Sequence, residues 1–139
     1  MPEIKSLAVG QVVAEKTFKL TRDSLVRYAG ASGDFNPIHY RDDVAKSVGL
    51  PGVLAHGMLT MGVSISPVVA WAGSASAVVD YSVRFTRPVV VPPTGSAELK
   101  VIAVVGLIEE ETSRVRIDLT TTFEENTVLG KAQAWVQLS

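Results

Sequence analysis

Apolar and polar residues alternate along most of the second half of the chain. The alternation is clear over residues 79–87, 97–107 and 115–123, and it returns less cleanly over 128–138. An earlier run, 12–20, alternates with one exception. A period of two predicts strands with one buried and one exposed face. Because the later connectors are short and carry turn residues, we expect consecutive strands there to be antiparallel neighbours.

Two short helices are predicted between the first strand and the middle of the chain. Thr21 can cap a helix over about 21–31, where the apolar residues fall on a helical face. Asp42 or Asp43 can cap a short helical turn over 44–48. Both helices are expected to be small.

The third predicted helix, from Gly57 to about Trp71, is apolar around its whole circumference. Such a helix is expected to be buried on all sides. Pro67 should kink it or start a second segment. A sheet with one apolar face can bury this helix by curling around it. The sequence therefore predicts an α+β fold: a single hot-dog domain over residues 1–139, with an antiparallel sheet wrapped around a long central helix.

Composition narrows the possible functions. The 139 residues contain no cysteine, which excludes disulfides, thiolate nucleophiles and cysteine-bound metals. A net charge of −1 with dispersed basic residues predicts no nucleic-acid or anionic-lipid partner. The most apolar stretch, 57–79, is interrupted by Ser, Pro and Gly, and the first residues do not resemble a signal peptide. We expect a cytoplasmic protein with no membrane span, and a dimer, because an edge strand tends to find a partner.

The chain has only two histidines, and the first lies in a loop that also holds a carboxylate. Asp34 and His39 would be roughly 17 Å apart in a fully extended chain. Gly33 permits a tight bend, and Pro37 disfavours a helix and extends Asn36. The loop can therefore fold back and bring acid and imidazole together for proton transfer. An Asx turn with a structural histidine is an equally good interpretation of this segment alone.

The second histidine, His56, precedes Gly57 at the predicted start of the apolar helix. Free N–H groups at a helix start, with the positive end of the helix dipole, can stabilise a developing oxyanion. Alternatively, Gly57 has no chemical role and only marks the point where the loop passes into the helix. Together the two segments are more specific than either one, because they combine an acid–base pair with an oxyanion donor.

Other chemistry is less well supported by the sequence. Asp34, His39 and His56 could ligate a metal, but the histidines lack helical ligand spacing, so we predict no metal. Arg84 and Arg87 could contact a substrate phosphate, although solvated strand-edge charges are the simpler interpretation. The candidate substrate-binding residues are Asn36, His56, Met58 and Met61, and the two methionines fit a core or an acyl tunnel.

Residues 28–39, Tyr-Ala-Gly-Ala-Ser-Gly-Asp-Phe-Asn-Pro-Ile-His, are followed by His-Gly-Met-Leu at 56–59. Together with Leu-Thr-Met-Gly at 59–62 and Val-Arg-Phe-Thr at 83–86, they resemble the MaoC-like, (R)-specific enoyl-thioester hydratases, including the mycobacterial (3R)-hydroxyacyl-ACP dehydratases. The resemblance implies a hot-dog fold, a catalytic dyad of Asp34 and His39, and an oxyanion donor at the Gly57 amide.

The resemblance also implies an activity: reversible hydration of trans-2-enoyl thioesters to (R)-3-hydroxyacyl thioesters, with CoA or acyl carrier protein as carrier and no cofactor. Some members carry a serine where this chain has Ile65, and we expect the flanking Ser64 and Ser66 to face elsewhere. A hot-dog thioesterase is disfavoured, because many place a carboxylate on the central helix and this one has none. A non-catalytic subunit should lack the dyad. A chain active as a homodimer, or only in a heterodimer with another hot-dog subunit, remains open.

Overall fold

A computed structural model describes residues 1–139 and contains one antiparallel sheet. Its order is β1-β3-β4-β6-β2, every neighbouring pair is antiparallel, and β5 pairs only with β4. The strands are β1 (Val12–Leu20), β2 (Val78–Phe85), β3 (Ala97–Glu109), β4 (Arg114–Phe123), β5 (Asn126–Thr127) and β6 (Leu129–Gln137). All five predicted strands are therefore present, and β5 is an addition.

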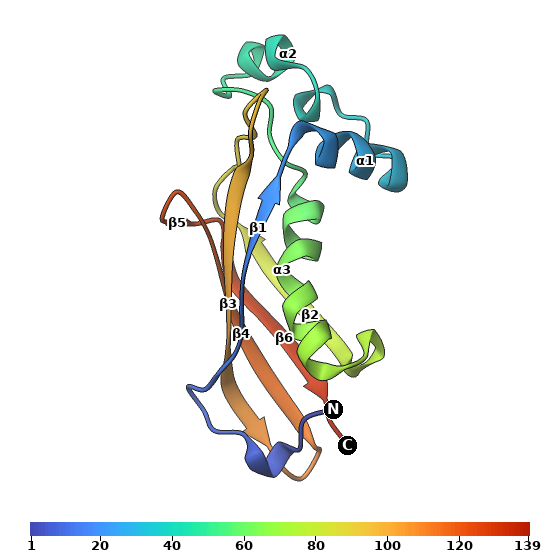
Figure 1. The fold of residues 1–139 in the computed structure, drawn as a ribbon, viewed down its shortest axis with the longest axis vertical. Coiled ribbons are helices and arrows are strands. Elements are labelled where there is room, and N and C mark those ends of the chain that lie inside the picture. The colour runs from blue at the N-terminus through green and yellow to red at the C-terminus, as the bar shows by residue number, and fades with distance from the viewer.

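Helices lie on one face and beyond one end of this sheet. They are α1 (Arg22–Ser32), α2 (Asp42–Ser47) and α3 (Gly57–Ala72), with 3-10 turns η1 (Ile4–Ser6), η2 (Pro37–His39) and η3 (Ala75–Ala77). α3 runs along the sheet, α1 and α2 gather beyond one end, and both termini lie towards the opposite end (Figure 1). α3 contacts all five long strands, which is the predicted α+β hot-dog arrangement. No helix has the length and apolar character needed to cross a membrane.

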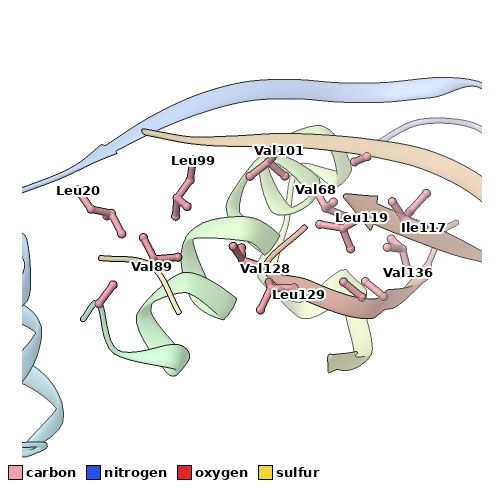
Figure 2. Packing of buried hydrophobic residues seen from close by; sticks show 14 of the residues in the cluster. Leu20, Val68, Val89, Leu99, Val101, Ile117, Leu119, Val128, Leu129 and Val136 are labelled. Atoms are coloured by element: carbon pink, nitrogen blue, oxygen red, sulfur yellow. The ribbon is translucent and has the colours of Figure 1, made fainter. Parts of the chain in front are cut away.

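The core lies between α3 and the sheet. Every second residue from Ala97 to Val105 of β3 is buried, and Val115, Ile117 and Leu119 continue the pattern on β4. Figure 2 shows Leu99 and Val101 of β3 and Leu119 of β4 on the side of the sheet that faces α3, together with Val68 of that helix. The apolar residues of the alternating pattern thus lie on the face of the sheet that contacts α3, as predicted.

The last strand alternates imperfectly because it contains a bulge. Ser82 of β2 pairs with Gln133, but Arg84 pairs with Gly130, so β6 carries one extra residue between these pairs. Lys131 lies in this interval with a φ of 46°, a left-handed conformation. A β-bulge displaces the side-chain alternation by one position, which explains the irregular pattern in the sequence.

Thr21 caps α1 as predicted, through a capping box with Ser24. The predicted cap of α2 is wrong: Arg41 is its N-cap residue, and Asp42 and Asp43 lie inside its first turn. Asp42 instead accepts two hydrogen bonds from Arg22, at 2.9 and 3.1 Å, and one from the amide of Val53. The hydrogen bonds from Arg22 hold the pKa of Asp42 below its usual value. The Asp42 carboxylate therefore binds Arg22, which is distant in the sequence, and does not cap α2.

α3 continues through Pro67, so the predicted second segment is not formed. Proline lacks an N–H, which leaves the carbonyl of Val63, one turn earlier, without its helical donor. The Ser66 hydroxyl donates to this Val63 oxygen at 2.8 Å. The helix therefore tolerates the proline because a neighbouring side chain replaces the missing backbone hydrogen bond.

The prediction that α3 is buried on all sides is wrong for the single chain. Its fully buried positions follow one helical face, whereas Met58 is 59% exposed on another. The buried face includes polar residues: Thr121 of β4 donates to Ser64 Oγ at 2.8 Å, and Ser64 donates to the carbonyl of Thr60 at 2.7 Å. These bonds satisfy the polar groups that face the sheet.

Candidate active site

The loop between α1 and η2 brings Asp34 and His39 together, as its sequence predicted. α1 ends at Gly33, whose φ of 76° turns the chain back. Asp34 Oδ1 then accepts from the amide of Asn36 at 3.1 Å, and Asn36 Oδ1 accepts from the amide of Ile38 at 3.3 Å. Two successive Asx turns thus fold the segment. Asp34 Oδ2 lies 4.0 Å from His39 Nε2.

His39 is held in one orientation by the backbone. Its Nδ1 lies 2.7 Å from the carbonyl oxygen of Leu54. Because a carbonyl can only accept, Nδ1 carries the proton, and Nε2 of the neutral ring presents a lone pair on the side of Asp34. Leu54 is itself fixed by a bond from its amide to the Ile38 carbonyl and by a bridge to Val90. The geometry suits a general base at Nε2.

His56 is only 1% exposed, and its ring lies against the ring of His39. The two rings stack with centroids 3.9 Å apart, and the edge contact with Tyr28 has a centroid distance of 4.7 Å. His56 Nε2 donates to the backbone carbonyl of Asp34 at 3.1 Å, and Nδ1 has no partner. Burial lowers the pKa of His56, which favours the neutral ring. The ring does not line the cavity, and its predicted contact with substrate stays a prediction.

Gly57 lines a cavity of about 290 Å³ together with His39. The start of α3 has no side-chain cap, so its first N–H groups are free to bind an oxygen. A Cβ on Gly57 would lie 3.0 Å from the ring of Phe85, so glycine allows this ring to pack closely against the start of α3. The complete lining is His39, Leu54, Ala55, Gly57, Thr60, Phe85, Thr86, Arg87, Pro88, Val89, Val128 and Leu129.

The other predicted substrate residues lie outside this cavity. Asn36 is exposed and begins η2 through its side-chain oxygen. Met58 is exposed, and Met61 is half-buried with its carbonyl accepting from the hydroxyl of Tyr81 at 2.9 Å. Burial raises the pKa of Tyr81 to about 12, so this hydroxyl keeps its proton. None of the three candidates lines the cavity with His39 and Gly57, and neither does Asp34, whose Oδ2 lies 4.0 Å from His39 Nε2.

Arg87 lines the cavity and donates to the side chain of Asn126 at 2.9 Å, whereas Arg84 is exposed and lies outside the lining. Ser64 faces the core and Ser66 caps the Val63 carbonyl, so both serines face away from the cavity, as predicted. The possible phosphate contact therefore stays a prediction for Arg87 alone.

Sequence reasoning missed Thr60 and the Leu54 carbonyl. Thr60 lines the cavity one turn after Gly57, and the spacing of three along a helix could have identified it. The Leu54 carbonyl fixes the tautomer of His39 and has no side-chain signal at all. Backbone groups that orient a site are visible only in the folded chain.

Asp34, His39 and His56 carry ligand atoms that lie within 4.8 Å of one another. A metal bound to both rings would have to lie in both ring planes at roughly 2.0–2.1 Å from each nitrogen. The planes are only 23° apart and the ring centroids are separated by 3.9 Å, so they do not meet at that distance. The arrangement as it stands does not fit a shared metal ion.

The neutral state of His56 predicts a pH dependence of stability. Its pKa is lowered below the ordinary value of 6.5 in the folded chain, so only the unfolded chain binds a proton there as the pH falls. Stability is then highest above this range and decreases towards acid. We expect the melting temperature to fall between about pH 7.5 and pH 5.5, and to fall less in His56→Gln. Equal pH slopes in thermal melts of both proteins would contradict the neutral state.

Comparisons with known proteins agree with this architecture. Residues 5–123 match the family described as the MaoC like domain. The chain is 42% identical over 76 residues to the 3-hydroxyacyl-thioester dehydratase X of Mycobacterium tuberculosis (strain ATCC 25618 / H37Rv). The matched region covers 55% of this chain and 26% of that protein. A solved MaoC-like dehydratase is 34% identical with a TM-score of 0.95, covering 99% of this chain and 42% of that one.

A third relative is closer to this chain in length. The R-hydratase PhaJ1 from Pseudomonas aeruginosa is 29% identical with a TM-score of 0.80, over 96% of this chain and 83% of its own. By contrast, the matches cover less than half of the first two relatives. The family match spans most of the chain, and the chain therefore belongs to the family of MaoC-like dehydratase domains.

Proposed function

We propose that this chain catalyses the reversible dehydration of (R)-3-hydroxyacyl thioesters to trans-2-enoyl thioesters. Its family and its relatives support a hydratase or dehydratase role. The observation that carries the proposal is the proximity of His39 Nε2 to Asp34 Oδ2, at 4.0 Å, with His39 and Gly57 lining one cavity. A base, an acid and an oxyanion donor then serve one substrate.

In the dehydration direction, His39 Nε2 takes the proton from C2 of the substrate. The electron pair moves into the thioester carbonyl, and the Gly57 amide donates to the developing oxyanion, supported by the dipole of α3. The C3–O bond then breaks. Asp34 orients the hydroxyl, which leaves as water after receiving a proton from the Asp34–His39 pair. No cofactor is required, because elimination of water is not a net oxidation or reduction.

The distance between the Asp34 carboxylate and the His39 imidazole fits their separate roles in this mechanism. At 4.0 Å, Asp34 Oδ2 and His39 Nε2 are too far apart for a hydrogen bond with each other. Both therefore stay available for a substrate whose reacting carbons are adjacent. Apolar side chains in the lining, among them Val89, Val128 and Leu129, suit an acyl chain. Acyl-CoA and acyl carrier protein thioesters remain the proposed substrates.

The direct test is turnover of short to long trans-2-enoyl thioesters, carried by CoA and by acyl carrier protein. Loss of enoyl absorbance without release of free thiol supports a hydratase. Release of thiol without loss of the enoyl group would show a thioesterase and overturn the proposal. Chiral analysis of the 3-hydroxyacyl product tests the (R) configuration.

We also propose that a second hot-dog chain pairs along β2. This strand is an edge of the sheet and exposes Val79 and Phe85, and the adjacent α3 exposes Met58. An unpaired edge with apolar side chains favours association, and a partner there would cover the open side of α3. The partner is a second copy or a related subunit.

Light scattering on the purified chain tests this pairing. We expect a homodimer of twice the 14.8 kDa chain mass, and a Val79→Lys variant that runs as a monomer because the new charge disfavours burial. A monomeric, inactive wild-type chain that gains activity with a second hot-dog subunit would identify the heterodimer instead. A monomer with full activity contradicts the pairing.

A further inference from the structure

The contacts of His56 are with the proposed dyad and not with the cavity. It is 1% exposed and does not line the cavity. One face of its ring stacks on His39, and Tyr28 meets it edge-on. Its Nε2–H donates to the backbone carbonyl of Asp34 at 3.1 Å. A single buried side chain thus contacts both segments of the proposed dyad.

His56 is also covalently joined to the third component. It is the N-cap residue of α3 and directly precedes Gly57. His56 therefore links the loop of Asp34 and His39, through its side chain, to the first amide of α3, through its backbone. Proton transfer and oxyanion stabilisation require these groups at fixed mutual distances, and a misplacement of about 1 Å can cost roughly 10²-fold in rate.

The hydrogen bonds assign opposite tautomers to the two rings. His39 carries its proton on Nδ1, because it donates to Leu54, and His56 carries its proton on Nε2, because it donates to Asp34. The bare Nδ1 of His56 has no partner. An unpaired acceptor is more easily tolerated in a protein interior than an unpaired N–H, so this tautomer is the favoured one.

A neutral His56 is also compatible with the work proposed for His39. The ionisable groups that face His56 are the His39 imidazole, the Asp34 carboxyl and the Tyr28 phenol. When His39 accepts a proton, a neutral ring 3.9 Å away adds no like charge, whereas a charged one would repel it. Burial lowers the pKa of His56, so this ring stays neutral and adds no positive charge beside His39.

We infer that His56 is the positioning residue of this site: its ring sets the plane of the His39 imidazole, and its Nε2–H holds the Asp34 segment against the start of α3. This inference rests on the proposed function for its catalytic consequence. The stack and the hydrogen bond make two separable contributions, because different side chains can retain one without the other.

Three substitutions separate these contributions. His56→Phe keeps a ring against His39 and loses the donor, His56→Gln keeps a donor and loses the ring, and His56→Leu loses both. Val68→Ala is the matched control, because it removes buried methyl groups from the same helix at a position outside the cavity and the dyad. Thermal melts identify the fraction of each variant that is folded.

We expect kcat to fall about 10-fold in His56→Phe and His56→Gln and roughly 30-fold in His56→Leu, with KM within about threefold of wild type. Val68→Ala should keep kcat despite a lower melting temperature. A rise in KM with unchanged kcat would indicate substrate contact, and a parallel loss of kcat in Val68→Ala would indicate general loosening. Either result, or wild-type kcat in His56→Leu, overturns the inference.

Nuclear magnetic resonance of labelled imidazole nitrogens gives a readout that does not depend on activity. With two histidines in the chain, we expect one Nδ1–H and one Nε2–H tautomer in wild type. In His56→Leu the Nδ1–H signal of His39 should lose its protection from exchange. Retention of that protection overturns the positioning role. A wild-type chain without hydratase activity would defeat the proposed function, and the imidazole signals would still decide this inference.

Discussion

Replacing His39 by alanine should lower kcat for a short enoyl thioester by roughly 10²–10⁴-fold, because the proposed general base is removed. His39 lines the cavity with Gly57, and its Nε2, the ring nitrogen not bonded to the Leu54 carbonyl, lies 4.0 Å from Asp34 Oδ2. The loss should appear in kcat more than in KM, since proton abstraction occurs in the transition state. Initial rates from enoyl absorbance, with a melt of the same sample, measure it.

A matched variant separates the base from its structural role. His39 also donates to the Leu54 carbonyl at 2.7 Å, and alanine leaves that oxygen without its donor. His39→Asn places an amide N–H near the position of Nδ1 but supplies no base. We expect it to melt closer to wild type than His39→Ala and to be equally inactive. Activity within a few-fold of wild type in His39→Asn would show that the imidazole performs no proton transfer.

The regular parts of the fold could be predicted because their signals are local. Alternation over residues 97–107 reflects which side chains face α3. Thr21 caps α1 through Ser24, three residues away, so this cap needs no distant partner. The failures involve long-range contacts. Asp42 is bound by Arg22 rather than capping α2, and the bulge at Lys131 depends on the register with β2.

The candidate site likewise has a part that local sequence predicts and a part that depends on long-range contacts. Asp34 and His39 lie in one short loop whose turns are set by Gly33 and Asn36, so their meeting follows from local residues. The stack of His56 on His39 requires the chain around Leu54 to return to the loop, where an isolated bridge to Val90 holds it. No spacing in the sequence encodes that return. The sequence therefore predicts His56 as a substrate-binding residue and gives no sign of its stack on His39.

Asp34→Asn should lower kcat by roughly 10²–10³-fold, because the amide cannot pass a proton between His39 and the departing hydroxyl. The fold should be unaffected. The side chain is 50% exposed, and its Oδ1 accepts from the amide of Asn36, a bond that asparagine retains. A large loss of turnover at an unchanged melting temperature is therefore the signature of a chemical role for this carboxylate.

The matched control is Asp43→Asn, which makes the same change on the neighbouring α2. Asp43 is an exposed carboxylate paired with Arg41, outside the cavity, and an exposed pair of this kind contributes little to stability. It should keep wild-type kcat, because the loss of one surface charge does not alter the reacting groups. If both variants lose activity equally, the loss of one negative charge accounts for the effect and Asp34 has no specific role as an acid. If Asp34→Asn retains half of wild-type turnover, His39 performs both proton transfers alone, and the dyad reduces to a single imidazole held by Leu54 and His56.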